Sequence, residues 1–430
     1  MGCATTLEWV VNNKYPVMNH SQALTEAERC LYCFDPPCVK ACPTHIDIPA
    51  FIKSIATKDT MTAANTIMAA NVLGYSCAKA CPVEVLCQGS CVYTKQDEPA
   101  IAIGRLQRFA MEHAMKAGPV ENVIGAPKTA TGKRVAAVGA GPASIAMAVM
   151  LAKEGIAVDV FDKRPFSGGL NAAGIAPYKL KHDEALGEIA WLTMPQVKFY
   201  PGMEISDYDS PTTRAAASLE QDYDAIFLGF GLGEGRRLFA SCNTMHNVWD
   251  AYSLIEAIKT SNKVDLTNVR RAHVIGGGNS AIDAAHIVRK LGVPYVAMWY
   301  RGLEKDASGY SHEFELAKMA GVYVFERHEV GEIIHEDDRV VGLIEKKSGV
   351  REACDLLIFA LGQKPMGELA QLFSNVTVNS QGLVIVDEKT YRTHNHKIWS
   401  AGDCVNGGKE VVNAVAEAKI AVKDMLSVLG

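Results

Sequence analysis

Eight of the twelve cysteines lie in one short stretch near the N-terminus, where their number and spacing could hold metal. The first group has the spacing Cys30-x2-Cys33-x4-Cys38-x3-Cys42-Pro43. The second group has the spacing Cys77-x3-Cys81-Pro82-x4-Cys87-x3-Cys91. Thiolates grouped in fours suit an iron–sulfur cluster or zinc, and eight cysteines would serve two such sites with none left over. Outside both groups lie Cys3, Cys242, Cys354 and Cys404. We expect the last three to be core residues.

Three kinds of site compete for this cysteine-rich region. Disulfides are disfavoured because the N-terminus has no signal-peptide pattern, and a cytoplasmic location, which we expect by default, keeps thiols reduced. Zinc sites more often use paired C-x2-C hooks, and only Cys30 and Cys33 make one here. Each group is instead similar to the ferredoxin run that ends in Cys-Pro, whose fourth cysteine binds the other cluster. Two 4Fe–4S clusters are therefore favoured, with zinc as the alternative.

A glycine-rich segment after the cysteine region is typical of a dinucleotide site. Arg134–Val138 predicts a strand, Ala143–Lys153 a helix and Ala157–Phe161 a second strand, which together form a βαβ unit. The turn before the helix reads Gly139-Ala140-Gly141-Pro142-Ala143-Ser144. Its glycines allow a tight turn and let backbone N–H groups approach a pyrophosphate at the helix N-terminus. Ser144 stands where a third glycine is usual and is small enough to preserve the packing of helix on strand.

Three further features assign a flavin to this first site. Asp162 ends the second strand, where an acid binds a ribose hydroxyl. The stretch Ser167-Gly168-Gly169-Leu170 follows shortly afterwards, and Ser400-Ala401-Gly402-Asp403 comes near the C-terminus. In flavoproteins with two dinucleotide sites, these two stretches accompany the first site and contact the flavin. We therefore expect FAD here and not NAD.

A second βαβ unit predicts a nicotinamide site. It runs from the strand Ala272–Ile275 through the helix Ala281–Lys290 to the strand Tyr295–Tyr300. The turn between the first strand and the helix reads Gly276-Gly277-Gly278-Asn279-Ser280. Arg301 follows the last strand, where it could meet the 2′-phosphate of NADPH or stack on the adenine of NADH. The residues alone leave both nucleotides open.

The combination of these sites predicts electron transfer. The chemistry belongs to the cofactors: a hydride moves from nicotinamide to flavin, and no protein acid or base is required. The flavin then divides the electron pair into single electrons, which iron–sulfur clusters can accept. The protein is therefore expected to be a flavin- and iron–sulfur-dependent NAD(P)H oxidoreductase without catalytic acid or base residues. The alternative is a binding module whose clusters are structural.

Length and charge set the expected architecture. The 430 residues suggest two or three domains, the net charge of -5 argues against a nucleic-acid binder, and no run of 18 apolar residues could cross a membrane. Helical spacing covers Ile48–Ala70 and Ala100–Ala117. The expected fold class is α/β, with an N-terminal α-helical double-cluster domain followed by two nested Rossmann-like domains. The domains would be 1–125 for iron–sulfur, 126–235 with 355–430 for FAD, and 236–354 for NAD(P).

This order of parts resembles a known family. A helical double-cluster domain followed by FAD and NAD(P) domains is similar to the small subunit of bacterial glutamate synthase. It resembles even more the N-terminal half of dihydropyrimidine dehydrogenase and its separate bacterial flavin subunit. The stretches that carry the resemblance are Cys30–Ile55, Asn71–Tyr93 and Ile101–Phe109. The likeness covers nearly the whole chain.

The resemblance implies an interleaved set of cluster ligands. One cluster would take three early cysteines and one late cysteine, namely Cys30, Cys33, Cys38 and Cys91. The other would take three cysteines and a glutamine on the following helix, namely Cys42, Cys81, Cys87 and Gln107. Cys77 is then not a ligand, and it remains the rival to Gln107.

The resemblance also implies contacts to both dinucleotides. Those to FAD would come from Gly139, Gly141, Pro142, Ala143, Ser144, Asp162, Gly168, Gly169, Leu170, Lys179, Gly402, Asp403 and Val411. Those to NAD(P) would come from Gly277, Gly278, Asn279, Ser280, Arg301, Ala360, Leu361 and Gly362. The family often has arginine at the position of Lys179. Gly302 stands where the mammalian-type enzyme has a second basic residue, which favours NADH over NADPH.

The resemblance finally implies a partner protein. This chain contains neither the FMN-binding barrel that reduces a pyrimidine nor an amidotransferase. We therefore expect a hetero-oligomer in which an FMN-containing barrel subunit of dihydropyrimidine dehydrogenase type accepts the electrons and reduces uracil or thymine. The alternatives are the large subunit of glutamate synthase, a ferredoxin or another oxidoreductase.

Overall fold

The computed structural model describes residues 16–260 and 264–430, and these form two compact units. The large unit runs from the start of the described residues to Ala172 and adds His182–Leu232 and Pro365–Gly430. The small unit consists of Ala173–Lys181 and Gly233–Lys364. Among the described residues, no helix is both long and apolar enough to cross a membrane.

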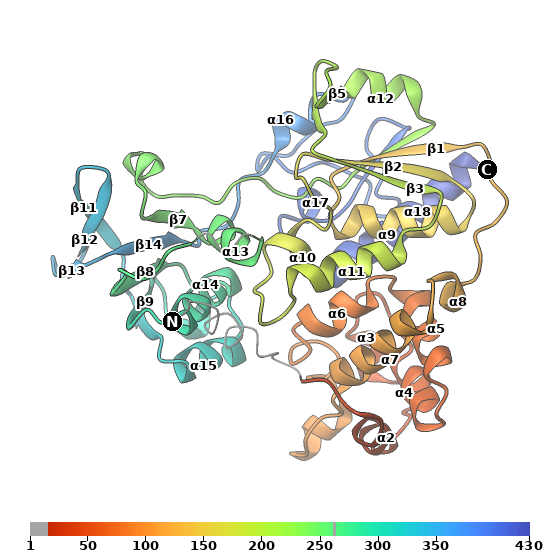
Figure 1. Ribbon diagram of the computed structural model, residues 1–430, viewed down its shortest axis with the longest axis horizontal. Helices are drawn as coiled ribbons and strands as arrows, with labels where there is room; N and C mark the ends of the chain where they lie inside the picture. The colour runs from red at the N-terminus through yellow and green to blue at the C-terminus, as the bar shows by residue number, and fades with distance from the viewer. Residues whose placement is uncertain (1–15, 261–263) are drawn as a thin grey trace. The chain divides into compact units, whose positions relative to one another are not determined.

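The large unit begins with a helical region that carries the eight grouped cysteines. Its helices are α2 (His20–Glu28), α3 (Pro37–Lys40), α4 (Ile48–Ala56), α5 (Thr60–Ala70), α6 (Gly74–Ala80), η1 (Val92–Gln96), α7 (Ile103–Ala117) and α8 (Glu121–Ile124). Figure 1 shows α4, α5 and α7 packed together in the orange part of the ribbon. The helical spacing over Ile48–Ala70 proves to be two helices, because Lys58 takes a positive φ of 65° and Asp59 caps α5.

A parallel sheet of five strands follows in the large unit, in the order β15-β6-β1-β2-β3. Its strands are β1 (Arg134–Val138), β2 (Ala157–Asp162), β3 (Val197–Pro201), β6 (Ala225–Leu228) and β15 (Ile398–Ser400). The helices around it are α9 (Pro142–Lys153), α10 (Leu170–Ala173), α11 (His182–Leu192), α12 (Ala216–Asp222), α16 (Gly367–Ala370), α17 (Asp403–Asn406) and α18 (Val411–Leu429). Helices α9 and α18 pack side by side, as Figure 1 shows. Because β1 has a crossover neighbour on each side, its carboxyl end is a topological switch point, where dinucleotides bind.

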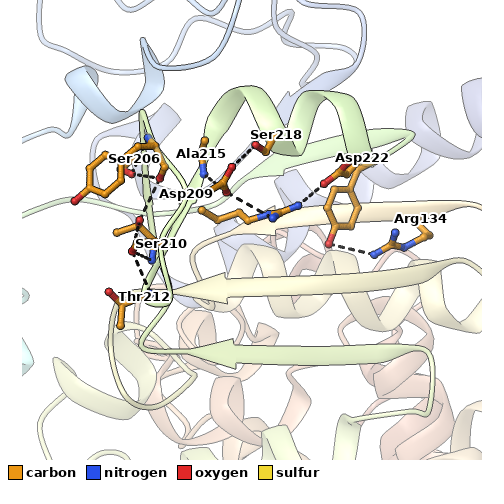
Figure 2. Close-up of polar contacts among 12 residues, drawn as sticks. Arg134, Ser206, Asp209, Ser210, Thr212, Ala215, Ser218 and Asp222 are labelled. Atoms are coloured by element: carbon orange, nitrogen blue, oxygen red, sulfur yellow. Dashed lines mark hydrogen bonds and ion pairs between the residues drawn. The ribbon is translucent and has the colours of Figure 1, made fainter.

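A small polar network lies next to α12, beside a separate two-stranded parallel sheet. It lies between β4 (Glu204–Ser206), β5 (Thr213–Ala215) and α12. The carboxylate of Asp209 accepts hydrogen bonds from the Ala215 N–H at 3.0 Å and the Ser218 hydroxyl at 2.5 Å, as Figure 2 shows. The Ser218 bond in particular lowers the pKa of Asp209. The network is exposed and far in sequence from the glycine turns, so we assign it a structural role.

Two side chains of α11 join the helical region to the rest of the large unit. Glu188 is fully buried and accepts hydrogen bonds from the Tyr75 N–H at 2.9 Å and from both the N–H and the hydroxyl of Ser76. Burial raises the pKa of Glu188 to about 7, although these hydrogen bonds act in the opposite direction. Glu184 forms a buried ion pair with Lys79 on α6. The helix that bears Cys77 and precedes Cys81 is thus held from outside the cysteine-rich region.

The small unit contains a second parallel sheet, in the order β10-β9-β8-β14-β7. Its strands are β7 (Val248–Asp250), β8 (Arg271–Ile275), β9 (Tyr295–Tyr300), β10 (Tyr323–Glu326) and β14 (Leu356–Phe359). The helices of this unit are η2 (Ala240–Thr244), α13 (Ala251–Thr260), α14 (Asn279–Lys290), η3 (Glu304–Asp306) and α15 (Ser311–Met319). An antiparallel sheet of β11 (Val330–Glu336), β12 (Arg339–Glu345) and β13 (Arg351–Ala353) completes it. The expected pair of Rossmann-like sheets is thus confirmed.

The expected boundary between the FAD and NAD(P) regions at residue 355 differs from the division of the structure by one strand. The strand β14 pairs with β7 and β8 in the second sheet, and Gly233–Lys364 is continuous within the small unit. Ala173–Lys181 also belongs to the small unit, although it lies within the range assigned to FAD. A short buried strand such as β14 carries the same apolar pattern in either parallel sheet, so its sheet could not be chosen from the pattern.

Candidate cofactor-binding sites

Four of the cysteines surround one apolar pocket in the helical region. Cys30, Cys33, Cys38 and Cys91 line it together with apolar residues that include Pro37, Ile52 and Ile103. The thiols lie close enough to act on one another electrostatically. Burial, followed by charge on Cys30 and Cys91, raises the pKa of Cys38 to about 12. The structure therefore brings together the three early cysteines and the one late cysteine of the predicted first ligand set.

The remaining grouped cysteines form a second set. The thiols of Cys77 and Cys81 are hydrogen-bonded, which is the largest cause of the raised pKa of Cys81. Charge on Cys87 also raises the pKa of Cys81. Burial, then charge on Cys42, raises the pKa of Cys87. Cys42, Cys77, Cys81 and Cys87 are therefore neighbours, and crowded buried thiols like these ionise readily only when a metal offsets their charge.

Gln107 also lies beside the second set. It is buried on α7 and its Nε2 donates a hydrogen bond of 2.7 Å to the carbonyl of Gly74, at the start of α6. This bond fixes the orientation of the amide and leaves Oε1 as the atom that could bind a metal. Cys77 lies on the same helix α6 and is 3% exposed. Cys77 is hydrogen-bonded to Cys81, and Gln107 contacts the first residue of the helix that bears Cys77, so the choice between the two rivals for the fourth ligand stays a prediction.

The donor sets fit clusters of several atoms. Thiolates in fours suit an iron–sulfur cluster, and a cluster requires its sulfur ligands to surround a volume. The first set does so, since its four cysteines line a pocket. In the described part of the chain, no three His, Cys, Asp or Glu side chains converge on one point as a single metal ion would require.

The glycine turn after β1 is shaped for close backbone approach. Gly139 has a φ of 88°, and a Cβ on it would lie 2.5 Å from the Cα of Phe230 and 2.7 Å from the carbonyl oxygen of Gly229. Gly141 is the N-cap of α9, and Pro142 occupies the first turn. Ala143 and Ser144 follow on the helix, and Ser144 packs against Gly229. The free N–H groups at this end of α9 can meet a pyrophosphate, so the segment fits the adenine dinucleotide half of FAD.

The next predicted flavin residues lie against the same turn. The Asp162 carboxylate at the end of β2 accepts hydrogen bonds from the Ala140 N–H at 2.7 Å and the Arg164 N–H at 2.8 Å. Gly168 donates its N–H to the carbonyl of Ala140 at 2.8 Å. Gly169 has a φ of 52°, and a Cβ on it would lie 2.9 Å from the Cα of Gly141. Leu170 then begins α10.

The C-terminal residues of the predicted flavin site follow β15, a strand of the same sheet. Gly402 has a φ of 82° and precedes Asp403, the first residue of α17. Burial, followed by charge on Glu417 and Glu410, raises the pKa of Asp403 to about 6. Val411 begins α18. These residues and the glycine turn thus lie in one compact unit, at elements that follow strands of one parallel sheet.

Glu417 was not predicted from the sequence. It lies on α18 and accepts the Gly402 N–H at 2.8 Å and the Asn406 amide at 2.9 Å. It therefore holds the turn that carries Asp403. The signal in the sequence was an acidic residue in a largely apolar helix, which does not by itself reveal a partner fifteen positions earlier.

The second glycine turn repeats this arrangement in the small unit. Gly278 caps α14, which begins with Asn279 and Ser280. The side-chain oxygen of Asn279 accepts the Tyr310 N–H at 2.9 Å, and the Ser280 hydroxyl donates to Tyr252 at 3.0 Å. The other predicted residues follow neighbouring strands of the same sheet: Arg301 follows β9, and Ala360, Leu361 and Gly362 follow β14. All therefore lie at the carboxyl edge of one sheet, where a dinucleotide is expected.

Gly276 and Gly277 show why glycine is required in the second turn. Gly276 has a φ of 148°, and a Cβ on it would lie 2.4 Å from the carbonyl oxygen of Ala360. A Cβ on Gly277 would lie 2.5 Å from the ring of Tyr300. Gly276 was absent from the predicted contacts because the usual motif emphasises the residues after it, yet it determines how closely β14 approaches the turn.

Lys179 has a different environment from the one predicted. It belongs to the small unit and is 8% exposed. Its amine forms ion pairs with Asp283 at 2.9 Å and Glu313 at 2.8 Å. The Tyr178 hydroxyl donates to the same Asp283 carboxylate. Burial lowers the pKa of Lys179, but the two carboxylates outweigh it and raise the pKa above the usual value. A contact between Lys179 and FAD stays a prediction, without support from these partners.

The ungrouped cysteines within the described residues are core residues, as predicted. Cys242 and Cys354 lie in one apolar core of the small unit, and Cys404 lies in that of the large unit. Burial raises the pKa of Cys404 to about 12 and raises the pKa of Cys354 as well. Cys3 lies outside the described residues.

Comparison with family models assigns both halves of the chain. Residues 9–119 match the family model described as dihydropyrimidine dehydrogenase domain II, 4Fe-4S cluster. Residues 133–418 match the model of pyridine nucleotide-disulphide oxidoreductases. The helical region and the two sheets are therefore a 4Fe–4S domain followed by FAD- and NAD(P)-binding Rossmann-like domains, which confirms the predicted fold class.

Two curated relatives from Escherichia coli (strain K12) align with almost the entire chain. The NAD-dependent dihydropyrimidine dehydrogenase subunit PreT is 31% identical over 95% of this chain and 94% of its own length. The small chain of NADPH glutamate synthase is 29% identical over 96% of this chain and 93% of its own length. The two relatives differ in the nucleotide given in their names, so nucleotide preference does not follow from the similarity alone.

Solved structures confirm the fold of the flavoprotein region. Thioredoxin reductase of T. acidophilum superposes with a TM-score of 0.54 at 18% identity, covering 68% of this chain and 97% of that one. FprA of Mycobacterium tuberculosis, solved in complex with NADPH, gives a TM-score of 0.53 at 17% identity, covering 69% and 85% of the two chains. At these identities the likeness concerns the fold alone.

Proposed function

Since the chain belongs to the pyridine nucleotide-disulphide oxidoreductase family and carries the 4Fe–4S domain of dihydropyrimidine dehydrogenase, we propose that it oxidises NAD(P)H through FAD and passes the electrons through two 4Fe–4S clusters to a partner. The observation that carries the proposal is the partition of eight cysteines into two neighbouring sets in the same compact unit as the flavin turn. The proposed partner is the catalytic subunit of a dihydropyrimidine dehydrogenase, which reduces uracil or thymine.

The residues of this chain bind and orient the cofactors. When bound, the flavin accepts a hydride and the clusters accept single electrons. The first cluster would be held by Cys30, Cys33, Cys38 and Cys91. The second would be held by Cys42, Cys81, Cys87 and Gln107. Buried side chains of the cysteine-rich region, such as Phe51 and Leu106, exclude water from the helical core. No residue is proposed as an acid or base, because hydride and electron transfer require none.

We infer that NADH is preferred over NADPH. Arg301 is exposed at the end of β9, but the Glu326 carboxylate occupies the same edge: Glu326 pairs with the last residue of β9, and its Oε1 accepts the Glu304 N–H at 2.7 Å. The nearby Glu304 carboxylate is compensated by an ion pair with Lys318 at 2.8 Å, so the repulsion of a 2′-phosphate would come from Glu326. We expect kcat/KM for NADH to exceed that for NADPH about tenfold, measured with a dye acceptor. In Glu326→Gln, the ratio of kcat/KM for NADH to kcat/KM for NADPH should become smaller. A preference for NADPH in the unmodified protein would contradict the inference.

The electrons are proposed to leave from the first cluster. Three of its four ligands, Cys30, Cys33 and Cys38, are half-buried, and the fourth, Cys91, is buried. Two apolar side chains of the same loop, Leu31 and Phe34, are 55% and 105% exposed. Exposed aromatic side chains of this kind are typical anchors of protein–protein contacts. This loop is therefore the proposed site of electron transfer to the partner.

Replacing Phe34 with alanine is expected to impair transfer to the partner and nothing upstream. Loss of an aromatic anchor costs about 2 kcal/mol of binding, so KM for the partner should rise roughly tenfold or more. NADH oxidation with a small dye should be unchanged. The matched control is Tyr208→Ala, an exposed aromatic on the same unit. Equal effects of the two variants, or an unchanged KM in Phe34→Ala, would show that electrons leave elsewhere.

Reconstitution with the partner tests the proposed function. The complete chain is combined anaerobically with an FMN-containing barrel subunit, and NADH oxidation is followed before and after addition of uracil. We expect oxidation that depends on uracil and on both proteins, with dihydrouracil formed in proportion. A stable complex without uracil-dependent oxidation would refute the assignment to pyrimidine reduction.

A glutamate synthase small subunit is the second candidate, favoured by the 29% identity to that relative along nearly its full length. Specific capture of a glutamate synthase large subunit from cell extract would decide for it.

A binding role with structural clusters predicts a different outcome. In an anaerobic titration with NADH, the flavin would then bleach while cluster absorbance and spin signals stayed constant.

A further inference from the structure

Helix α18 reaches from the predicted flavin site to the second cysteine set. It begins at Val411 and runs for 19 residues to Leu429. Lys419 lies eight residues after Val411, which corresponds to about 12 Å along a helix. Its amine donates hydrogen bonds to the carbonyl of Thr44 at 3.3 Å and to the carbonyl of Ala70 at 3.0 Å. One lysine of the flavin-binding region thus joins two segments of the cysteine-rich region.

The first of these segments carries a cluster ligand. Thr44 follows the Cys42-Pro43 pair and is 2% exposed. Its hydroxyl lies 3.3 Å from the sulfur of Cys42. A hydroxyl at this distance can donate to a thiolate, and hydrogen bonds to ligand sulfurs set cluster potentials. By holding the Thr44 carbonyl, Lys419 fixes the residue whose side chain contacts that sulfur.

The second segment leads to the rival fourth ligands. Ala70 ends α5, and the buried Asn71 follows, whose side-chain oxygen accepts the Leu73 N–H at 3.0 Å. The next residue, Gly74, accepts the amide of Gln107 and begins the helix that bears Cys77. The position of the Ala70 carbonyl therefore determines where Gln107 and α6 can lie.

Lys419 also carries a charge that nothing nearby balances. Within the described residues, no carboxylate lies at ion-pairing distance from its amine, and both of its bonds go to carbonyls. Burial lowers the pKa of Lys419, while charge on Cys42 raises it. A cation in this position is electrostatically complementary to a group ligated by thiolates.

We propose that Lys419 is a positioning residue of the second cluster, which fixes the Cys42 and Ala70–Gly74 segments and makes the cluster easier to reduce through its positive charge. The proposal rests on the two-cluster function proposed above. A cluster gains negative charge when it accepts an electron, so a nearby cation favours the reduced form. The residue would thereby help the flavin-side cluster to accept electrons.

Redox titration of the complete, cofactor-loaded protein tests the proposal. The signal of the second cluster is first identified as the one lost in Cys87→Ser, and its potential is measured by spin resonance in Lys419→Met. We expect the ratio of reduced to oxidised second cluster at a fixed potential to fall about tenfold, a shift of about 59 mV for one electron. The first cluster should stay unchanged. Lys419→Arg keeps the charge and should restore most of the potential.

The matched control is Lys423→Met, which removes an exposed lysine one turn further along α18. In this variant, the ratio of reduced to oxidised cluster at a fixed potential should stay within twofold of that in the unmodified protein, for both clusters. Loss of only the second cluster in Lys419→Met, with half the iron and all the flavin retained, would also support the positioning role. An unchanged potential, an equal shift in Lys423→Met, or joint loss of both clusters and flavin would overturn it. Because no partner is present, these results do not depend on which substrate the complex reduces.

Discussion

Gln107→Ala is expected to disrupt one of the two clusters and to leave the other cluster and the flavin in place. The amide of Gln107 is oriented by its bond to the Gly74 carbonyl, and its oxygen would complete the second ligand set with three cysteines. Without that oxygen the second site has an open position, and we expect iron content to fall towards half. Iron and sulfide analysis and the spin signals of the reduced protein measure the change.

Cys77→Ala is the matched comparison for the fourth ligand. Cys77 is buried on α6 and hydrogen-bonded to Cys81, but it is not a ligand in the interleaved arrangement. The variant should keep all of its iron and both spin signals. Gln107→Glu, which keeps an oxygen at the same place, should retain the second cluster with an altered potential. Loss of a cluster in Cys77→Ala, with none in Gln107→Ala, would restore a ligand set made only of cysteines.

Lys179→Met is expected to lower the free energy of unfolding of the small unit by about 3–5 kcal/mol. The substitution leaves the buried Asp283 and Glu313 carboxylates without their shared cation. Removing one partner from a buried ion pair is costly because the remaining charge stays desolvated. Urea unfolding measures the loss, and hydrogen exchange in α14 localises it to this unit. Lys305→Met, which removes an exposed lysine of the same unit, should change stability little.

The loss in free energy of unfolding caused by Lys179→Met should become smaller as the pH falls. Burial already raises the pKa of Asp283, Lys179 lowers it, and Glu313 raises it further. Without the lysine, the folded-state pKa rises further above the unfolded value. The folded protein then binds more protons than the unfolded chain, so stability increases as the pH falls from about 8 towards 5. A deficit that is constant or grows over this interval would show that lost packing, and not uncompensated charge, destabilises the variant.

Much of the fold and of the dinucleotide sites could be predicted because their determinants are local. A strand, a glycine turn and a helix follow one another within about twenty residues, so the elements around Gly139 and Gly278 were recognisable from order alone. The cysteine partition was different. Spacing alone suggests two equivalent groups of four, whereas Cys91 lines the pocket of the early cysteines, a grouping that the family resemblance implied but the spacing did not.

The interactions that could not be predicted join positions far apart in sequence. The bond from Lys419 to Thr44 spans 375 residues, and the ion pair from Lys179 to Glu313 spans 134. Each side chain reads as an ordinary surface charge in its own segment. The sheet to which β14 belongs could not be predicted for a related reason, because its pairing with β7 and β8 depends on the path of the whole chain. Tertiary contacts of this kind leave no periodic signal.

The buried Glu188 has a consequence for recombination between relatives. Its carboxylate lies outside the cysteine-rich region but receives its hydrogen bonds from Tyr75 and Ser76 inside it. A chimaera joined at the linker near residue 125 would inherit the donors from one parent and the acceptor from the other. If the cysteine-rich region of the other parent offers no hydrogen-bond donors at the positions of Tyr75 and Ser76, the hybrid would contain Glu188 as a buried carboxylate without hydrogen bonds. Exchangeable iron–sulfur modules in this family must therefore be delimited by three-dimensional contacts, with α11 transferred together with the cysteines.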